Sequence, residues 1–255
     1  MLSHGYPLRF SGQDVERGTF SHRHVVVADQ TTGQKYNMMN NFVSENEQSK
    51  VQIGNSHLSE YAALAYEYGY SVSNPLALTI WEAQFGDFAN GAQAAIDNYI
   101  VSGESKWGIQ SGLIMNLPHG MDGQGPEHSS ARIERYLQLM SDNLSEIVQE
   151  HKDHVKRPIK NSNIQVVITS YAANYFHLLR RQILREYRKP LINCFNKKLL
   201  KYKHAASKLK DFTEQKRFNT IVDEPHFDEL VLPDQIRKVI IISGQAYYDL
   251  LEFRR

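Results

Sequence analysis

The sequence has 255 residues, of which 41% are hydrophobic and 22% are charged, and its formal net charge is +1. These values are ordinary for a globular protein with a substantial core, and the small net charge argues against a dedicated nucleic-acid-binding protein. The single cysteine, Cys194, excludes an internal disulfide. Because no run reaches the length of about 18 apolar residues, we expect no membrane span.

Short β-rich runs alternate with longer helical patterns along the chain. The runs are rich in Val and Ile and almost continuously apolar, as strands buried on both faces should be. The expected strands cover residues 24–30, 76–81, 111–117, 164–170, 190–195 and 237–244. The expected helices cover residues 58–72, 89–101, 129–140 and 172–188. This alternation predicts an α/β fold with a mostly parallel sheet and helices on both faces.

Two polar segments interrupt the alternation. Residues 142–163 are strongly charged and have no clear apolar face, so we expect a surface insertion there. Residues 197–235 separate the main unit from the last expected strand and its helix. That final pair predicts the beginning of a second α/β unit.

A glycine-rich loop follows the expected strand 111–117, where ligands gather in parallel sheets. His119 and His128 flank it, and both rings can titrate near neutral pH or donate to an anion. Its three glycines, which permit positive φ or close approach to a ligand, are Gly120, Gly123 and Gly125. The alternative is a turn with a satisfied histidine at each end. We expect no metal site, because the closely spaced ligand pattern of zinc is absent.

Other polar residues admit two interpretations each. Glu60 is either a catalytic acid or a first-turn acid that follows the helix cap Ser59. Residues 81–93, which include Phe85 and Phe88, could form a pocket wall, or Asp87 or Asn90 could simply cap the next helix. The basic stretches 180–189 and 197–210 could bind phosphate groups or an acidic partner, although a solvated helical face is commoner.

Taken together, several segments closely resemble the E1 component of 2-oxoglutarate dehydrogenase, a thiamine-diphosphate enzyme. They run in family order and span nearly the whole chain. They are RGTFSHRH, LSEYAALAYEYGY, LTIWEAQFGDFANGAQAAIDNYI, SGESKWG, LPHGMDGQGPEHSSARIERYLQL, YFHLLRRQILREYRKPLI and SGQAYYDLLE.

The resemblance implies a transketolase-like architecture. Residues 1–205 would be the pyrimidine-binding domain, and residues 206–255 a connecting segment with the first strand and helix of the C-terminal α/β domain. The family's GDG motif, which holds Mg²⁺ and the diphosphate, is absent and is expected on an upstream domain. The chain is therefore expected to be a fragment that is inactive in isolation.

The resemblance also implies the roles of five residues. Glu60 matches the glutamate that contacts N1′ of the aminopyrimidine. Phe85 is the first candidate for packing on that ring and Phe88 the second. His128 matches a histidine near the reacting carbon, and His119 lies in the same loop.

The activity implied is oxidative decarboxylation of 2-oxoglutarate in the tricarboxylic acid cycle, with succinyl transfer to the lipoyl group of the E2 succinyltransferase. E2, E3 and a second copy of the full-length enzyme are the expected partners. The expected location is the mitochondrial matrix in a eukaryote and the cytoplasm in a bacterium. Two alternatives remain: an E1 paralogue that prefers 2-oxoadipate, and a non-catalytic interaction module.

Overall fold

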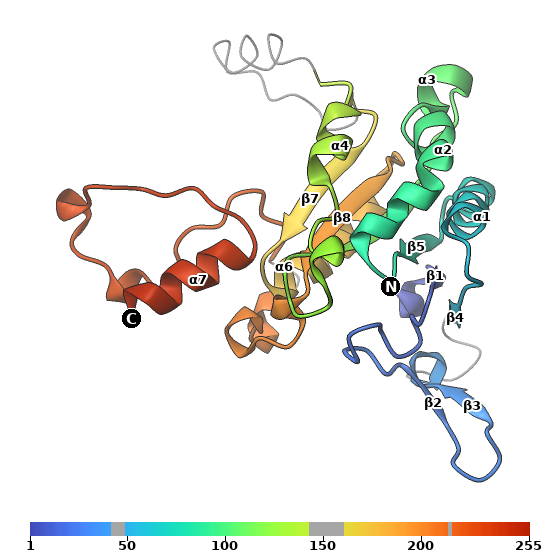
Figure 1. Cartoon of the computed structure of the whole chain (residues 1–255), viewed down its shortest axis with the longest axis horizontal. Helices are drawn as coiled ribbons and strands as arrows, with labels where there is room; N and C mark the ends of the chain where they lie inside the picture. Colours follow the sequence, from blue (N-terminus) through green and yellow to red (C-terminus); the bar gives the residue numbers. More distant parts are fainter. Residues whose placement is uncertain (42–48, 143–160, 214–215) are drawn as a thin grey trace.

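The computed structural model describes residues 1–41, 49–142, 161–213 and 216–255 (Figure 1). Its centre is a six-stranded sheet of order β4-β1-β5-β6-β8-β7, in which each neighbouring pair is parallel. The strands are β1 (Leu8–Gly12), β4 (Val51–Asn55), β5 (Leu78–Glu82), β6 (Ile114–His119), β7 (Gln165–Thr169) and β8 (Leu191–Asn196). The predicted α/β class with a parallel sheet is confirmed.

Helices cover both faces of the sheet. The helices are α1 (Glu60–Ser73), α2 (Gln93–Ala95), α3 (Gly103–Trp107), α4 (Ile133–Gln138), α6 (Ala172–Leu184) and α7 (Gln245–Arg254). Side chains of β6 alternate between the two faces, as the pleat of a strand requires. Met115 shares a core with Leu64 of α1 and Tyr136 of α4, whereas Ile114 shares a core with Leu178 of α6.

Helix α1 shows how the sequence fixes the start of a helix beside the sheet. The Ser59 hydroxyl accepts a hydrogen bond from the backbone N–H of Ala62 at 3.3 Å, which fixes the first turn. Further along, Glu67 is 2% exposed and pairs with Arg9 of β1 through two 2.7 Å hydrogen bonds. Because α1 follows a parallel strand, its N-terminus lies near the carboxyl ends of the strands.

The expected strand 24–30 is only partly correct. Its centre forms β2 (Val26–Ala28), which pairs antiparallel with β3 (Lys35–Asn37) outside the main sheet. The sequence pattern missed β1 and β4. In β1 the polar residues Arg9 and Ser11 interrupt the apolar run.

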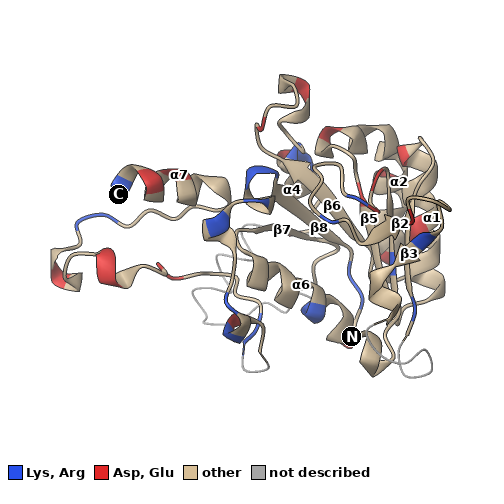
Figure 2. Cartoon of the chain, turned by 90° about the horizontal axis from the view of Figure 1, so that it is seen from below, with Lys and Arg blue, Asp and Glu red and all other residues tan. Residues whose placement is uncertain are grey.

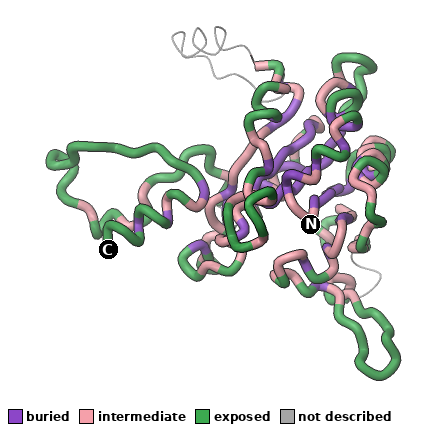
Figure 3. The backbone as a smooth tube through the Cα atoms, viewed as in Figure 1, coloured by how far each residue is buried: buried purple, intermediate pink, exposed green. Residues whose placement is uncertain are grey.

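The expected strand 237–244 is wrong, because residues 237–243 form no strand and Ile241 is 96% exposed. In Figure 3 the tube is coloured as exposed along this segment. A strand satisfies its backbone groups by pairing, and no strand lies beside this segment in the described ranges. The helix after it does form, since Tyr248 and Leu251 of α7 pack on Ala205.

The expected surface insertion at 142–163 lies mainly outside the described residues. Within the described part of the chain, no helix is both long and apolar enough to cross a bilayer.

Candidate functional site

The carboxyl ends of β5, β6 and β8 bring most of the predicted site residues to one edge of the sheet. Phe85 and Phe88 follow β5, His119 ends β6, and His128 lies in the glycine-rich loop after it. The three glycines of that loop all have positive φ, between 78° and 98°, as the sequence predicted.

His128 is held by an acid and two aromatic rings. Its Nδ1 lies 3.1 Å from both carboxylate oxygens of the buried Asp87. Its ring stacks on Phe85 with a centroid distance of 3.8 Å and an interplanar angle of 12°, and meets Phe88 at 86°. Because an ionised carboxylate only accepts hydrogen bonds, Nδ1 carries the proton. Nε2 is then the nitrogen available to a ligand.

His119 has the opposite arrangement. Its Nδ1 accepts a hydrogen bond from the backbone N–H of Ala131 at 3.1 Å, so the ring proton lies on Nε2. Burial, reinforced by the nearby Lys197, lowers the pKa of His119. The ring is therefore a neutral donor at physiological pH.

Lys197, directly after β8, lies beside these residues; the sequence placed it only within the basic stretch 197–210, for which a solvated helical face was the commoner interpretation. It is 3% exposed, and its Nζ donates to the backbone oxygen of His128 at 2.6 Å. Its ammonium also lies 5.6 Å from the ring centroid of Phe85. Burial lowers the pKa of Lys197, against the opposing effect of Asp87 and Asp122. Its position after a buried strand was the signal available in the sequence.

Glu60 lies at the start of α1 and is partly buried. Its Oε1 accepts a hydrogen bond from the side-chain amide of Gln13 at 2.7 Å. A methyl group built on Gly91 would come within 3.6 Å of Oε2, so the acid lies against that glycine. Ala62, in the same first turn, is exposed, and Gln13 and Gly91 are the neighbours of the carboxylate.

One 3-10 segment, Gly86–Ala92, joins the two parts of the site. Asp87 and Phe88 near its start hold His128, and Gly91 near its end lies against Glu60. At roughly 2 Å per residue, these ends are on the order of 10 Å apart. The acid and the imidazole thus contact opposite ends of the same short segment.

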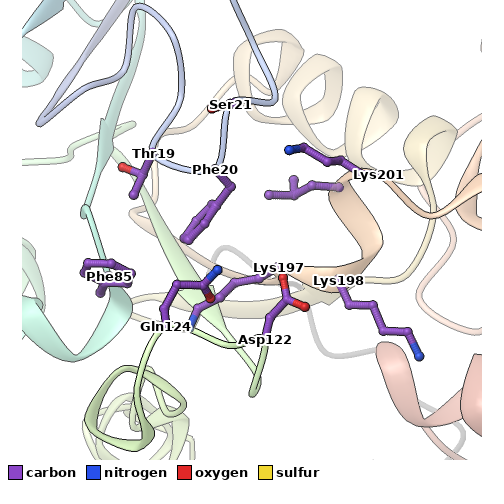
Figure 4. A pocket seen from close by; sticks show the side chains of 10 residues that line it. Thr19, Phe20, Ser21, Phe85, Asp122, Gln124, Lys197, Lys198 and Lys201 are labelled. Atoms are coloured by element: carbon purple, nitrogen blue, oxygen red, sulfur yellow. The ribbon is translucent and has the colours of Figure 1, made fainter.

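A pocket of about 480 Å³ opens beside Phe85 (Figure 4). Three segments form most of its wall: residues 19–21, 122–124 and 197–201. Phe85 is the one of the five predicted site residues that lines it. Three lysines and one acid line the wall: Lys197, Lys198, Lys201 and Asp122. Although Lys198 pairs with Asp249, the positive excess favours an anionic ligand.

A buried polar network supports the segment that carries Phe20. Arg23 donates to both carboxylate oxygens of Glu82 at 2.9 and 2.7 Å, and to the backbone oxygen of Val15 at 2.8 Å. Asn116 donates to Glu82 at 3.4 Å and to the Tyr175 hydroxyl of α6 at 2.8 Å.

Comparison with known proteins identifies the fold family. A family model for the transketolase pyrimidine-binding domain matches residues 1–203. The chain belongs to this family. A second model, for the 2-oxoglutarate dehydrogenase C-terminal region, matches residues 206–255 of this family member. The resemblance drawn from the sequence motifs is therefore confirmed.

Named relatives of this pyrimidine-binding domain agree with the family models. The chain is 49% identical over its whole length to the mitochondrial 2-oxoglutarate dehydrogenase of Schizosaccharomyces pombe, and 47% identical to that of Dictyostelium discoideum. It is 48% identical, over 98% of its length, to the 2-oxoglutarate dehydrogenase E1 component of Brucella ovis. In each case it spans about a quarter of the relative's length.

Proposed function

We propose that this chain provides the aminopyrimidine side of an E1 active site that decarboxylates 2-oxoglutarate and passes the succinyl group to the lipoyl arm of E2. The observation that carries the proposal is that one short helical segment, Gly86–Ala92, contacts Glu60 near one end and holds His128 near the other. The relatives that carry the name 2-oxoglutarate dehydrogenase support the choice of substrate.

The residues present fit an aminopyrimidine ring. Oε2 of Glu60 has no hydrogen-bond donor in the described residues, so it is free to meet a ring nitrogen. Phe85 and Phe88 are only partly buried and offer apolar surface nearby. Among the described residues, no group of three or more His, Cys, Asp or Glu could hold a metal. We propose from the family resemblance alone, and not from this result, that Mg²⁺ and the diphosphate are held by residues other than those that contact the aminopyrimidine.

Each side chain then has a defined task. Thiamine diphosphate, when bound, supplies the nucleophilic carbon and the electron sink for decarboxylation. Glu60 holds a proton at N1′ of the aminopyrimidine, while Gln13 fixes its other oxygen. His128, oriented by Asp87, presents Nε2 to the substrate, and His119 presents an Nε2–H donor. Both can orient the keto or carboxylate oxygens and stabilise developing negative charge.

Glu60→Gln in the intact enzyme tests the acid. Loss of the transferable proton should lower kcat about 10²–10⁴-fold, while the amide keeps the side-chain shape and the fold. Steady-state kinetics and circular dichroism measure the two effects. Glu186→Gln, at an exposed glutamate, is the matched control and should retain full activity. Near-wild-type turnover in Glu60→Gln would reject the assignment.

The second candidate function is an E1 that prefers 2-oxoadipate, which is one methylene longer. One methylene contributes only about 1–3 kcal/mol to discrimination, and the basic pocket beside Phe85 accepts either dicarboxylate by charge. Comparing kcat/KM of the intact enzyme for the two keto acids decides between them. A several-fold preference for 2-oxoadipate would overturn the choice of 2-oxoglutarate.

A non-catalytic interaction module is the third candidate, because the chain carries only the aminopyrimidine side. Calorimetry of the 255-residue protein with thiamine diphosphate and Mg²⁺ distinguishes a half-site from a complete one. We expect no micromolar binding by this chain alone; such binding would contradict the half-site.

The partners and location follow from the same proposal. E2 and E3 would complete the complex, and a second copy of the full-length enzyme would complete the homodimer. The eukaryotic relatives are named mitochondrial, and bacterial relatives also match. We therefore propose the mitochondrial matrix in a eukaryotic host and the cytoplasm in a bacterial one.

A further inference from the structure

Lys197 contacts both ends of the loop that carries the two site histidines. Its backbone N–H donates to the backbone oxygen of His119 at 3.1 Å, and its Nζ donates to the backbone oxygen of His128 at 2.6 Å. Because both bonds start from one residue, the ammonium has a defined place relative to both histidines. Its side chain runs along the pocket toward Phe85, whereas that of Lys198 points away (Figure 4).

The ammonium of Lys197 has unused donors. An ammonium carries three N–H groups, and among the described residues only the backbone oxygen of His128 accepts one of them. Its other contacts are with the rings of Phe20 and Phe85, whose centroids lie 5.9 and 5.6 Å from Nζ. These rings attract the cation through their faces. Two N–H groups are therefore available to a ligand in the pocket of about 480 Å³ that Lys197 lines.

The charge of Lys197 has no ion pair in the described part of the chain. Asp87 and Asp122 lie near enough to favour the charged form, but neither forms an ion pair with it. The other two lysines of the pocket differ, because Lys198 pairs with an acid of α7 and Lys201 is exposed. A buried cation without a counter-ion is unfavourable, and an anionic ligand would remove that cost.

No broad positive surface replaces this local cation. The net charge is only +1, and Figure 2 shows basic and acidic positions interspersed along the described chain. Lys189, which is 4% exposed, pairs with Glu104, so burial of a lysine elsewhere in the fold is accompanied by an acid. Selectivity for an anionic group must therefore arise at the pocket itself, where Lys197 is the buried lysine.

We infer that Lys197 is a specificity-determining residue whose ammonium binds the carboxylate that the substrate keeps through the reaction. The inference rests on the proposed function, in which a 2-oxo dicarboxylic acid loses one carboxylate and retains the other. Phe85 stacks on His128 and lines the same pocket as Lys197, so the pocket leads from the imidazole stack to the ammonium. A substrate without the second carboxylate would leave a buried donor unpaired, which is a strong basis for rejection.

Two substrates of equal length separate charge recognition from support of the loop. 2-Oxoglutarate and 2-oxovalerate share the carbon chain and the reacting 2-oxo acid, but only 2-oxoglutarate has a second carboxylate. In the intact enzyme, Lys197→Met should lower the ratio of kcat/KM for 2-oxoglutarate to that for 2-oxovalerate by about tenfold or more. Lys197→Arg keeps the charge and should retain most of the ratio. Lys203→Met, at an exposed lysine outside the pocket wall, is the matched control and should leave both values unchanged.

Support of the loop alone would give a different result. If Lys197 only holds the backbone of His128, Lys197→Met lowers kcat/KM for both acids by the same factor, and that outcome would overturn the inference.

Glutarate, which has both carboxylates but no keto group, tests the same contact without turnover. Calorimetry with the intact enzyme should show a Kd for glutarate that is about tenfold weaker in Lys197→Met than in the wild type. Absence of glutarate binding in the wild type, or an unchanged Kd in Lys197→Met, would also overturn the inference. A wild-type enzyme that decarboxylates neither acid would reject the proposed function instead, and the glutarate measurement would still decide the role of Lys197.

Discussion

Asp87 determines which nitrogen of His128 carries a proton, and this one contact decides what the imidazole can do. The carboxylate holds Nδ1–H, Phe85 fixes the plane of the ring, and Lys197 binds the backbone oxygen of the same residue. Hydrogen-bond partners fix the tautomer and the orientation of metal-bound histidine rings, and these contacts act on His128 in the same way.

Asp87→Asn in the intact enzyme should therefore lower kcat while preserving the fold. The amide has nearly the same shape but lacks the charge that favours protonated Nδ1, so we expect a loss of about 10–100-fold. Asp97→Asn, at an exposed acid of the next helical segment, is the control for a general charge effect. Equal kcat values for the two variants would contradict an orienting role for Asp87.

His22 gives the protein a defined pH dependence of stability. Burial, with Arg23 beside it, lowers the pKa of His22 to about 4, whereas an unfolded histidine titrates near 6.5. Between these values the unfolded state binds a proton that the folded state does not, so stability falls as pH decreases from about 6.5 to about 4. In His22→Gln, the free energy of unfolding measured in urea should fall by roughly 2–3 kcal/mol less than in the wild type over this pH range. His57→Gln, at an exposed histidine, should leave the slope as it is.

The sequence indicated the titratable residues of the site but not their supports. Glu60, His119 and His128 were identified through a resemblance to known motifs. Lys197 looks like a solvated lysine in sequence, because its burial depends on the loop that folds over it from the β6 end. The role of Arg23 is equally invisible in the sequence, because its partner Glu82 lies 59 residues away in the chain.

At the scale of elements, the segment Gly86–Ala92 is the spacer that sets the geometry of the site. Gly86 lets this segment approach β6 closely: a Cβ there would lie 2.3 Å from the backbone oxygen of Pro118 and 2.5 Å from the Ala131 Cβ. Glycine is required by space and not by φ at this position.

Gly86→Ala should consequently push the spacer away from β6 and disturb the Phe85–His128 stack. Overpacking of this kind costs about 1–3 kcal/mol, measured by chemical denaturation. Gly69→Ala on α1 is the matched control, because its Cβ would meet nothing within 4 Å. That variant should be more stable by roughly 0.5–1 kcal/mol. Two variants of equal stability would show that Gly86 is not closely packed.

Elements were predictable where the apolar run was long and uninterrupted. The expected strands at β5, β6, β7 and β8 all formed; β5 is buried throughout and β6 and β8 along most of their length, whereas the edge strand β7 is only partly buried. β1 was missed because Arg9 breaks its pattern, and only the distant Glu67 makes that arginine acceptable inside the sheet. The opposite error occurred at 237–244, where an apolar run had no strand to pair with.

At the scale of the whole molecule, the segment 237–243 is an exposed apolar ribbon. Val239 and Ile241 are 80% and 96% exposed, and no strand among the described residues covers them. Unpaired apolar segments of this type promote association between chains.

Ile241→Lys should reduce self-association of the 255-residue protein in sedimentation velocity, because a charge opposes pairing at a free edge. Its Tm should stay at the wild-type value, since Ile241 packs on nothing in either face of the sheet. Leu209→Lys, at an isolated exposed leucine, should leave association unchanged. Undiminished association in Ile241→Lys would exclude the ribbon as the contact.

The strand order β4-β1-β5-β6-β8-β7 has a consequence for how the protein is made. β8 lies between β6 and β7, so β7 leaves the ribosome before the strand that must separate it from β6 exists. Every neighbouring pair joins distant parts of the chain, and such topologies have high contact order and fold slowly. During synthesis, the edge of β6 therefore stays unpaired until β8, which ends at Asn196, has been made. Unpaired strand edges are prone to aggregate, so we expect chaperones to assist at this stage.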